Sequence, residues 1–126
     1  MKPREDITAA ERSVMEVLWD RQDGATVRQI VLAMYGRHEH SLHGGVKSFL
    51  DRLIEKQYIK VDKSGFAHQF FAVVSREEFV GFQLQGIAAS HFNGSFVPML
   101  MSLVSQAKLS KADRAAIEKL IANIRQ

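Results

Sequence analysis

The sequence predicts a mainly α-helical fold with one small β-hairpin, and three observations support this. An amphipathic helix of about 16 residues begins near Ser41, and its apolar residues are spaced for one buried stripe: Val46, Phe49, Leu50 and Leu53. Residues 58–63 alternate in polarity, Ser64-Gly65 supplies a turn, and residues 66–74 return as a second strand. Helical patterns lie on both sides of this segment. This order of elements predicts a winged helix-turn-helix followed by a C-terminal helical region.

Two helices are expected upstream of the long amphipathic one. The first begins after Thr8, because Glu11 three residues further on gives the spacing of a capping box, and it ends before Gly24. Thr26 caps the second, which we expect to run to Tyr35. Each carries an apolar stripe that should face a core: Val14, Met15, Leu18 and Trp19 in the first, and Val27, Ile30, Val31 and Met34 in the second.

Three more helices are predicted after Val74. The first starts at Ser75, the second near Phe96 after the turn signal Asn93-Gly94, and the last at Ser110. These helices have no sheet of their own to cover, so we expect them to pair with the same region of a second chain. The residues expected at this dimer interface are Phe79, Phe82, Gly86, Ile87, Phe96, Leu100, Leu103, Val104, Ile117, Leu120, Ile121 and Ile124.

Composition limits the class of protein. A chain of 126 residues that is 46% hydrophobic can bury one modest core and a smaller satellite, which we predict as domains 1–74 and 75–126. There is no cysteine, so disulfides and thiolate metal sites are excluded. No N-terminal stretch resembles a signal peptide, and no apolar run reaches the roughly 18 residues that span a bilayer. We therefore expect a cytoplasmic protein without membrane insertion.

The distribution of charge predicts a double-stranded DNA partner. Residues 1–25 carry four basic and six acidic side chains, whereas residues 26–75 carry seven basic and four acidic, a local net charge of +3. The basic excess lies on the predicted recognition helix (about 41–57) and wing (about 58–74), where phosphate contacts would be needed. The predicted DNA contacts are Ser41, His43, Gly44, Gly45, Lys47, Ser48, Arg52, Lys63, Ser64 and His68.

Different roles are expected within this set. Lys47 could donate hydrogen bonds to guanine, while Ser41, Ser48 and Arg52 are better suited to positioning on phosphate. The glycine pair Gly44-Gly45 could let the helix backbone approach a phosphate closely. Alternatively, the first turn is frayed or the helix starts only at Val46, since each glycine disfavours a helix interior by about 1 kcal/mol relative to alanine.

Neither a metal site nor a catalytic site is predicted. His38, His40 and His43 lie close together in the sequence, but Glu39 is the only carboxylate near them, so a full coordination shell would need distant ligands. We expect these histidines to face DNA instead, with no metal or other cofactor. No serine or carboxylate accompanies a histidine in a recognisable catalytic motif, so an enzyme is not expected.

Several short segments, taken together, resemble one family. They are Ile7-Thr-Ala-Ala-Glu11, Val14-Met15, Leu18-Trp19, Ala25-Thr-Val-Arg-Gln-Ile30, Val46-Lys47 with Leu50, Arg52-Leu53 and Lys56, Phe70-Phe71-Ala72, Ser75-Arg-Glu-Glu78, Asn93-Gly94-Ser95-Phe96 and Leu109-Ser110. This combination, which covers nearly the whole chain, resembles the penicillinase-repressor family of bacterial winged-helix regulators, which includes the methicillin-resistance repressors.

The resemblance implies a homodimer that binds a near-palindromic operator and represses transcription. In several members, a membrane sensor protease system triggers cleavage at an Asn-Phe bond in the dimerisation region. The matching position here is Ser102-Leu103, which departs from that pattern. The copper-responsive branch carries a C-terminal pair of cysteines that this chain lacks.

Two other functions fit the same sequence. One is a winged-helix protein-interaction module, which the low net charge and Gly44-Gly45 favour. The other is a small-molecule-sensing regulator with a pocket at the dimer interface, lined by Phe79, Phe82 and Phe92. Steep salt dependence of DNA affinity would separate DNA binding from the first of these.

Overall fold

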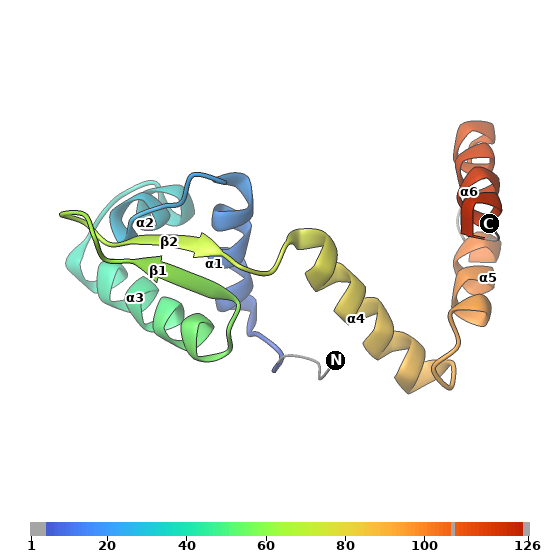
Figure 1. Ribbon diagram of the computed structural model, residues 1–126, viewed down its shortest axis with the longest axis horizontal. Helices are drawn as coiled ribbons and strands as arrows, with labels where there is room; N and C mark the ends of the chain where they lie inside the picture. Colours follow the sequence, from blue (N-terminus) through green and yellow to red (C-terminus); the bar gives the residue numbers. More distant parts are fainter. Residues whose placement is uncertain (1–4, 107, 125–126) are drawn as a thin grey trace. The chain divides into compact units, whose positions relative to one another are not determined.

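A computed structural model describes residues 5–106 and 108–124, of which Ile124 is described by its backbone alone. These residues form six helices and a two-stranded antiparallel sheet (Figure 1), which confirms the predicted fold class. The elements in order are α1 (Ala9–Asp20), α2 (Val27–Tyr35), α3 (His40–Glu55), β1 (Ile59–Asp62), β2 (Gln69–Ala72), α4 (Arg76–His91), α5 (Phe96–Gln106) and α6 (Lys111–Ile124).

The chain forms two compact units, which we describe separately. The winged-helix unit comprises residues 1–82 and the C-terminal unit residues 83–126, so the division falls within α4. The functional division into 1–74 and 75–126 stays a prediction.

The first two helices begin where the sequence places them. The Thr8 hydroxyl accepts a hydrogen bond from the Glu11 amide (3.1 Å), and the Glu11 carboxylate accepts one from the Thr8 amide (3.0 Å), which completes a capping box. Thr26 and Gln29 repeat this arrangement at the start of α2. Gly36 then ends α2 with a φ of 72°, a left-handed conformation that glycine adopts without strain.

The start of α3 differs from the prediction that Ser41 caps it. Glu39 is the N-cap, with an extended backbone whose carbonyl accepts a hydrogen bond from the His43 amide (3.0 Å). Its carboxylate pairs with Arg37 (2.9 Å) instead of capping the helix, so Ser41 lies inside the first turn. Gly44-Gly45 also lies within α3, and therefore the helix does not start at Val46.

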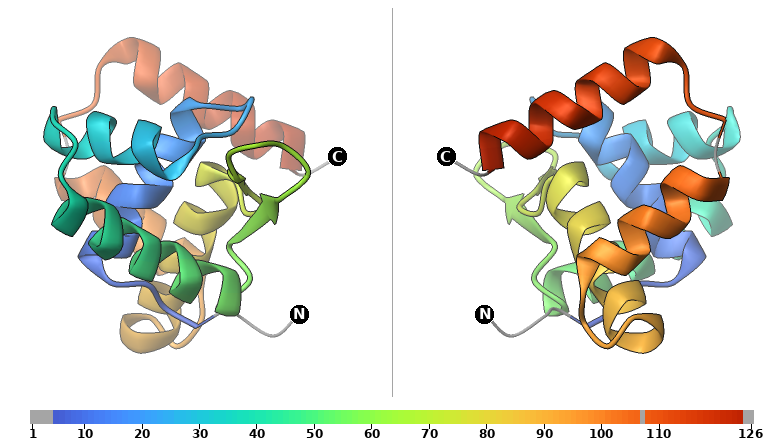
Figure 2. Two further views of the ribbon diagram at one scale, coloured as in Figure 1. Left: turned by 90° about the vertical axis from the view of Figure 1, so that its left-hand side faces the viewer. Right: turned by 90° about the vertical axis from the view of Figure 1, so that its right-hand side faces the viewer.

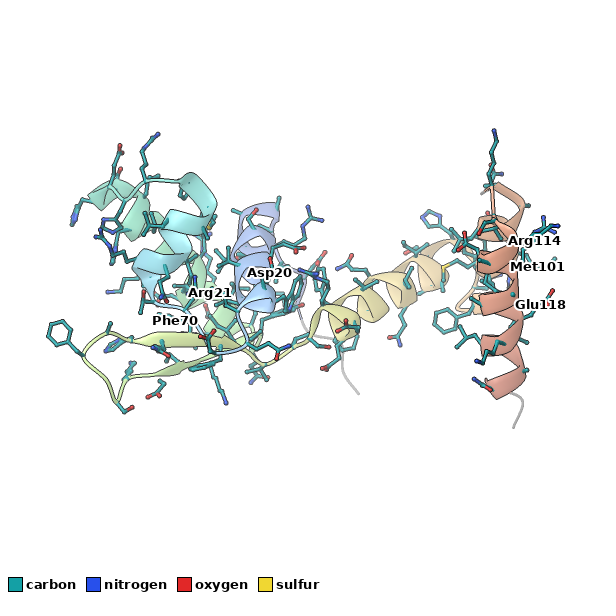
Figure 3. All side chains as sticks on the ribbon, turned by 90° about the horizontal axis from the view of Figure 1, so that it is seen from above. Asp20, Arg21, Phe70, Met101, Arg114 and Glu118 are labelled. Carbon is teal, nitrogen blue, oxygen red and sulfur yellow. The ribbon has the colours of Figure 1, made fainter. Side chains whose placement is uncertain are left out.

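The core of the winged-helix unit collects the apolar stripes of α1, α2 and α3 against the hairpin. Figure 1 shows the hairpin beside these three helices, and Phe70 of β2, labelled in Figure 3, is 6% exposed. Ala25 extends the sheet by an isolated bridge to Phe70, with backbone hydrogen bonds of 2.8 and 3.1 Å. The fully buried members of the core are Val14, Met15, Ala25, Ile30, Val31, Val46, Leu50, Leu53 and Val74.

One ion pair joins the start of α1 to the end of α3. The Glu11 carboxylate is completely buried, and the Lys56 ammonium donates a hydrogen bond to it at 2.8 Å and another to the Asp6 carbonyl at 2.9 Å. Burial tends to raise the pKa of Glu11, but the hydrogen bonds from Lys56 and Thr8 outweigh it and leave this pKa below 4.5. The hydrogen bond with Glu11 correspondingly raises the pKa of Lys56 above 10.5.

The turn of the wing is longer than the predicted Ser64-Gly65 pair. β1 and β2 are in register from Ile59 opposite Ala72 to Asp62 opposite Gln69, so residues 63–68 form the connecting loop. The Asp62 carboxylate accepts hydrogen bonds from the Ser64 amide (2.9 Å) and hydroxyl (2.6 Å), which also lower the pKa of Asp62. The hydrogen bonds from Ser64 to the Asp62 side chain compete with strand pairing next to Asp62, and the loop is therefore longer than a two-residue turn.

The first turns of α4 are attached to α1 by its tryptophan. The Trp19 indole donates a hydrogen bond to the Val74 carbonyl (2.8 Å), and its ring packs against Phe79 at 5.4 Å between centroids. The Arg76 guanidinium lies over the same ring and reaches the carboxylates of Glu16 (2.7 Å) and Asp20 (3.4 Å).

In the C-terminal unit, a turn at Asn93-Gly94 separates α4 from α5, as predicted. Both residues have positive φ (53° and 80°), and the Gly94 amide donates to the Ala88 carbonyl at 2.8 Å. The Ser110 hydroxyl accepts a hydrogen bond from the Asp113 amide (3.0 Å) at the start of α6. Figure 2 shows α5 and α6 as two separate helices that follow this turn.

Candidate nucleic-acid interface

A cleft of about 770 Å³ lies between α3, the wing and the first turn of α2. Four residues predicted from the sequence line it: His43 and Lys47 from α3, and Lys63 and His68 from the wing. The position of Lys47 follows from the helical stripe, because burial of Val46 and Leu50 turns the adjacent outer face of α3 to solvent.

The other predicted contacts on α3 lie outside this cleft. Ser41, Gly44, Ser48 and Arg52 are exposed, and Gly45 is half-buried. In the wing, the Ser64 hydroxyl is bonded to Asp62 within the turn, so this serine orders the loop rather than presenting a free hydroxyl.

Among the cleft residues that the sequence interpretation missed, three carry a charge or an exposed aromatic ring. Arg28 adds a cation from the first turn of α2, and its place two residues after the Thr26 cap is the signal that could have revealed it, because the helix dipole disfavours a cation there unless an anion is near. Asp51 lies one helical turn after Lys47 and offers an acceptor of the kind that pairs with the cytosine amino group. Phe66, in the wing loop, is the third.

Two histidines at the edge of the cleft are paired. Nε2 of His38 lies 3.0 Å from Nδ1 of His43, with the ring planes nearly perpendicular. Burial, together with the positive charge of Arg28 and the neighbouring histidines, lowers the pKa of His38 below 6.5. His38 therefore holds the His43 ring in place as a neutral hydrogen-bond partner at neutral pH.

No group of three histidine, aspartate or glutamate side chains that could hold a metal ion occurs within residues 5–106 and 108–124. Of the three histidines that lie close together in the sequence, His38 and His43 form a pair, and His40 is one of the neighbours that lower the pKa of His38.

The C-terminal unit carries an exposed apolar face on α5 and α6. Eight large apolar side chains of these helices are 37–65% exposed. A groove of about 530 Å³ between the two helices is rimmed by Met101 of α5 and by Arg114 and Glu118 of α6 (Figure 3). The eight exposed side chains are Phe96, Val97, Leu100, Met101, Leu103, Val104, Leu120 and Ile121.

The residues predicted for a dimer interface differ in their surroundings. Six of them, Phe96, Leu100, Leu103, Val104, Leu120 and Ile121, belong to this exposed face, and Ile117 lines its groove. Ile87 and Gly86 are exposed on α4, and the side chain of Ile124 lies outside the described residues. Val97 and Met101 also belong to this exposed face, and each continues the apolar run of α5.

Phe79 and Phe82 differ from this expectation. Phe79 is 8% exposed and packs against the rings of Trp19 and Tyr58, and Phe82 is half-buried against the same core. Both help to close the winged-helix unit, because α4 begins on the surface of α1. We therefore leave them out of the interface that we propose below.

The Ser102-Leu103 bond, which the family resemblance predicts as the match to the cleavage position, lies in the middle of α5. Both side chains are exposed. A cut at this bond would divide the helix that supplies most of the exposed apolar face.

A helix that crosses a bilayer must be both long and predominantly apolar. No single helix in the described part of the chain is long and apolar enough, and α4 with α5 meets the requirement only as a pair bent by 98°.

Comparisons with known proteins agree with the fold. The family model described as penicillinase repressor matches residues 7–123. A Mycobacterium tuberculosis protein named transcriptional regulator BlaI is 30% identical over 115 residues, which cover 90% of this chain and 81% of that protein. The same regulator from a second strain matches equally well. This chain therefore belongs to the penicillinase repressor family, whose members are transcriptional regulators and not enzymes.

Proposed function

We propose that this protein is a homodimeric repressor that acts in the cytoplasm and binds a near-palindromic operator in double-stranded DNA. The observation that carries the proposal is the cleft in which α3 and the wing present Lys47, Lys63, His43 and His68 together with Arg28. An α-helix fits the major groove, and the cations beside it suit the flanking phosphates.

The apolar face of α5 and α6 supports the dimer. Monomeric proteins rarely expose a large contiguous apolar patch, and a second copy presenting the same patch would cover both by two-fold symmetry. Two copies of α3 would then read half-sites about one helical turn of DNA, ~34 Å, or a multiple apart.

The first experiment is a selection of genomic fragments by the purified full chain in the presence of competitor DNA. We expect enrichment of a palindrome with half-sites one or more helical turns apart. Retention of fragments without enrichment of any sequence would mean that the protein binds DNA through charge alone. A DNA affinity that does not change with salt concentration would favour the protein-interaction module instead.

Lys47→Ala should weaken binding to the enriched operator by about tenfold, because a side chain that hydrogen-bonds a base edge contributes about 1–3 kcal/mol of discrimination. Fluorescence anisotropy on the operator and on a scrambled duplex measures this. Lys119→Ala, which removes an exposed lysine of α6, is the matched control. Equal operator affinity for the two variants would remove Lys47 from base recognition.

Gly44→Ala and Gly45→Ala should separate stability from DNA binding. A Cβ at either position meets no described atom within 4 Å, so each alanine is expected to stabilise α3 by up to about 1 kcal/mol. If the glycines allow close approach of phosphate, the same variants bind the operator several-fold more weakly. Gly81→Ala, equally open but on α4, should gain stability and keep its affinity. Undiminished operator affinity in both α3 variants would contradict the role of the glycines.

For derepression, we propose that the relevant event is cleavage within α5. Cleavage at Ser102-Leu103, by a sensor protease system of the kind the family resemblance implies, would divide the apolar face and release the operator. Appearance of a fragment ending at Ser102 in induced cells, identified by mass spectrometry, would support this route, and induction with an intact chain would exclude it.

A further inference from the structure

The wing carries a phenylalanine that the fold itself does not use. Phe66 lies in the loop between β1 and β2 and is fully exposed, at 110% of the reference area, whereas the next most exposed large apolar side chains, Val97 and Met101, reach 65%. The loop occupies the outer end of the hairpin (Figure 1). An aromatic ring held in water at such a position is suited to contact with another molecule.

The loop that presents Phe66 is already ordered. Asp62 binds both the amide and the hydroxyl of Ser64, and the paired strands fix the two ends of the loop at Asp62 and Gln69. A contact made by Phe66 would therefore require little further ordering of the backbone, which favours binding.

The neighbours of Phe66 indicate what kind of molecule it contacts. Phe66 lines the same cleft as Lys63 and His68 of the wing and Lys47 of α3. A partner that reaches Phe66 from this side also meets these two lysines and Arg28, and the three cations favour a partner with an array of negative charge. Duplex DNA combines such an array with apolar faces between its base pairs.

The arrangement of the two grooves in duplex DNA indicates which of them the wing would meet. With Lys47 and Asp51 of α3 against base edges in the major groove, the wing side of the cleft, with Lys63 and His68, receives the phosphate backbone that separates this groove from the adjacent minor groove, and the wing tip faces the latter. Apolar side chains such as phenylalanine act in minor grooves as wedges that part neighbouring base pairs, most easily at flexible pyrimidine–purine steps.

We propose that Phe66 enters the minor groove beside each half-site and inserts between two base pairs, so that operator choice includes a deformable step outside the bases read by α3. The inference rests on the proposed function, because it requires that α3 and the wing bind DNA together.

The test uses the full-length protein and the operator enriched in the selection, with 2-aminopurine placed singly at each flanking position. Wild-type binding should raise 2-aminopurine fluorescence at one step beside each half-site, because unstacking relieves quenching. Phe66→Ala should abolish this rise and bind about tenfold more weakly, since the loss of one base–aromatic stack is of that order. Its exposed position means that the thermal midpoint should not change.

Two further variants serve as controls. Phe66→Leu should retain part of the fluorescence rise, because a leucine also acts as a wedge. Lys63→Ala should keep the rise but reduce the slope of log affinity against log salt by about one, as expected for a lost phosphate contact.

The outcomes distinguish this inference from the proposed function. Equal affinity and equal fluorescence for wild type and Phe66→Ala would overturn it, and so would weaker binding of that variant without any fluorescence rise in the wild type. If the wild-type protein enriches no palindrome, the proposed function fails first, and the wedge is rejected with it.

Discussion

Lys56→Met is expected to destabilise the winged-helix unit by about 3 kcal/mol, because it leaves the carboxylate of Glu11 buried without its counter-charge. The side chain of Lys56 is 14% exposed and that of Glu11 is not exposed at all, so solvent cannot replace the lost partner at the carboxylate. Methionine keeps the length and most of the volume of lysine, and packing changes should therefore contribute little.

The dependence of this pair on pH follows from the two shifted pKa values. Because the folded-state pKa of Glu11 is lowered, its contribution to stability is present above about pH 4.5 and is lost as the pH falls through the folded value. Because the pKa of Lys56 is raised, its contribution is complete below about pH 10.5 and is lost as the pH rises through its folded value.

The Lys56→Met variant should reverse the acid behaviour. Without the ammonium, burial tends to raise the pKa of Glu11, and protonation then removes the unpaired charge. The deficit in the free energy of unfolding should therefore become smaller as the pH falls and Glu11 takes up a proton. Urea unfolding curves at several pH values measure this.

The matched control is Lys60→Met, which removes the same charge from an exposed position on β1. Its effect should stay within about 0.5 kcal/mol. Equal urea midpoints for the two methionine variants at neutral pH would contradict the structural importance of the Glu11–Lys56 pair.

Leu103→Asp is expected to convert the proposed dimer to a monomer and to weaken binding to the proposed operator by about 100-fold. Leu103 is 56% exposed on α5, so its replacement leaves no cavity within one chain, but it would place a carboxylate in the apolar contact between two chains. Separated half-site readers lose the high effective concentration that linkage provides, which accounts for a loss of this order.

Ser102→Asp is the control for this variant, because it introduces the same charge at the neighbouring exposed position of α5. Light scattering gives the mass in solution, and anisotropy gives the operator affinity. A Leu103→Asp protein that remains a dimer at the same concentration would move the interface away from this part of α5.

The helix starts that could be predicted from the sequence are those that carry local capping chemistry. Thr8 with Glu11 and Thr26 with Gln29 satisfy the first amides through side chains only three residues apart, so the sequence alone fixes these starts. α3 lacked such a signal in the described structure: the Glu39 carboxylate turns to Arg37, and the helix begins by backbone geometry alone.

Contacts between distant segments could not be predicted in the same way. Phe79 shares the helical spacing of an interface residue, and only its packing on Trp19 and Tyr58 assigns it to the core. Likewise, the sequence alone does not distinguish Lys56 from the other surface cations. Only the packing of α1 brings Glu11 beside it. In the wing, the Asp62 carboxylate accepts a hydrogen bond from the Ser64 amide, and the turn is longer as a result. The alternating polarity of the strand does not reveal this side-chain hydrogen bond.

The attachment of α4 to α1 also gives the protein a built-in optical probe. Trp19 is the single tryptophan of the chain, and its indole is hydrogen-bonded to Val74, stacked beneath Arg76 and packed against Phe79. Any event that loosens the first turns of α4 must change the polarity around this one fluorophore. Its emission spectrum can therefore follow that junction in the unlabelled protein, for example during a titration with duplex DNA, without a signal from any other tryptophan.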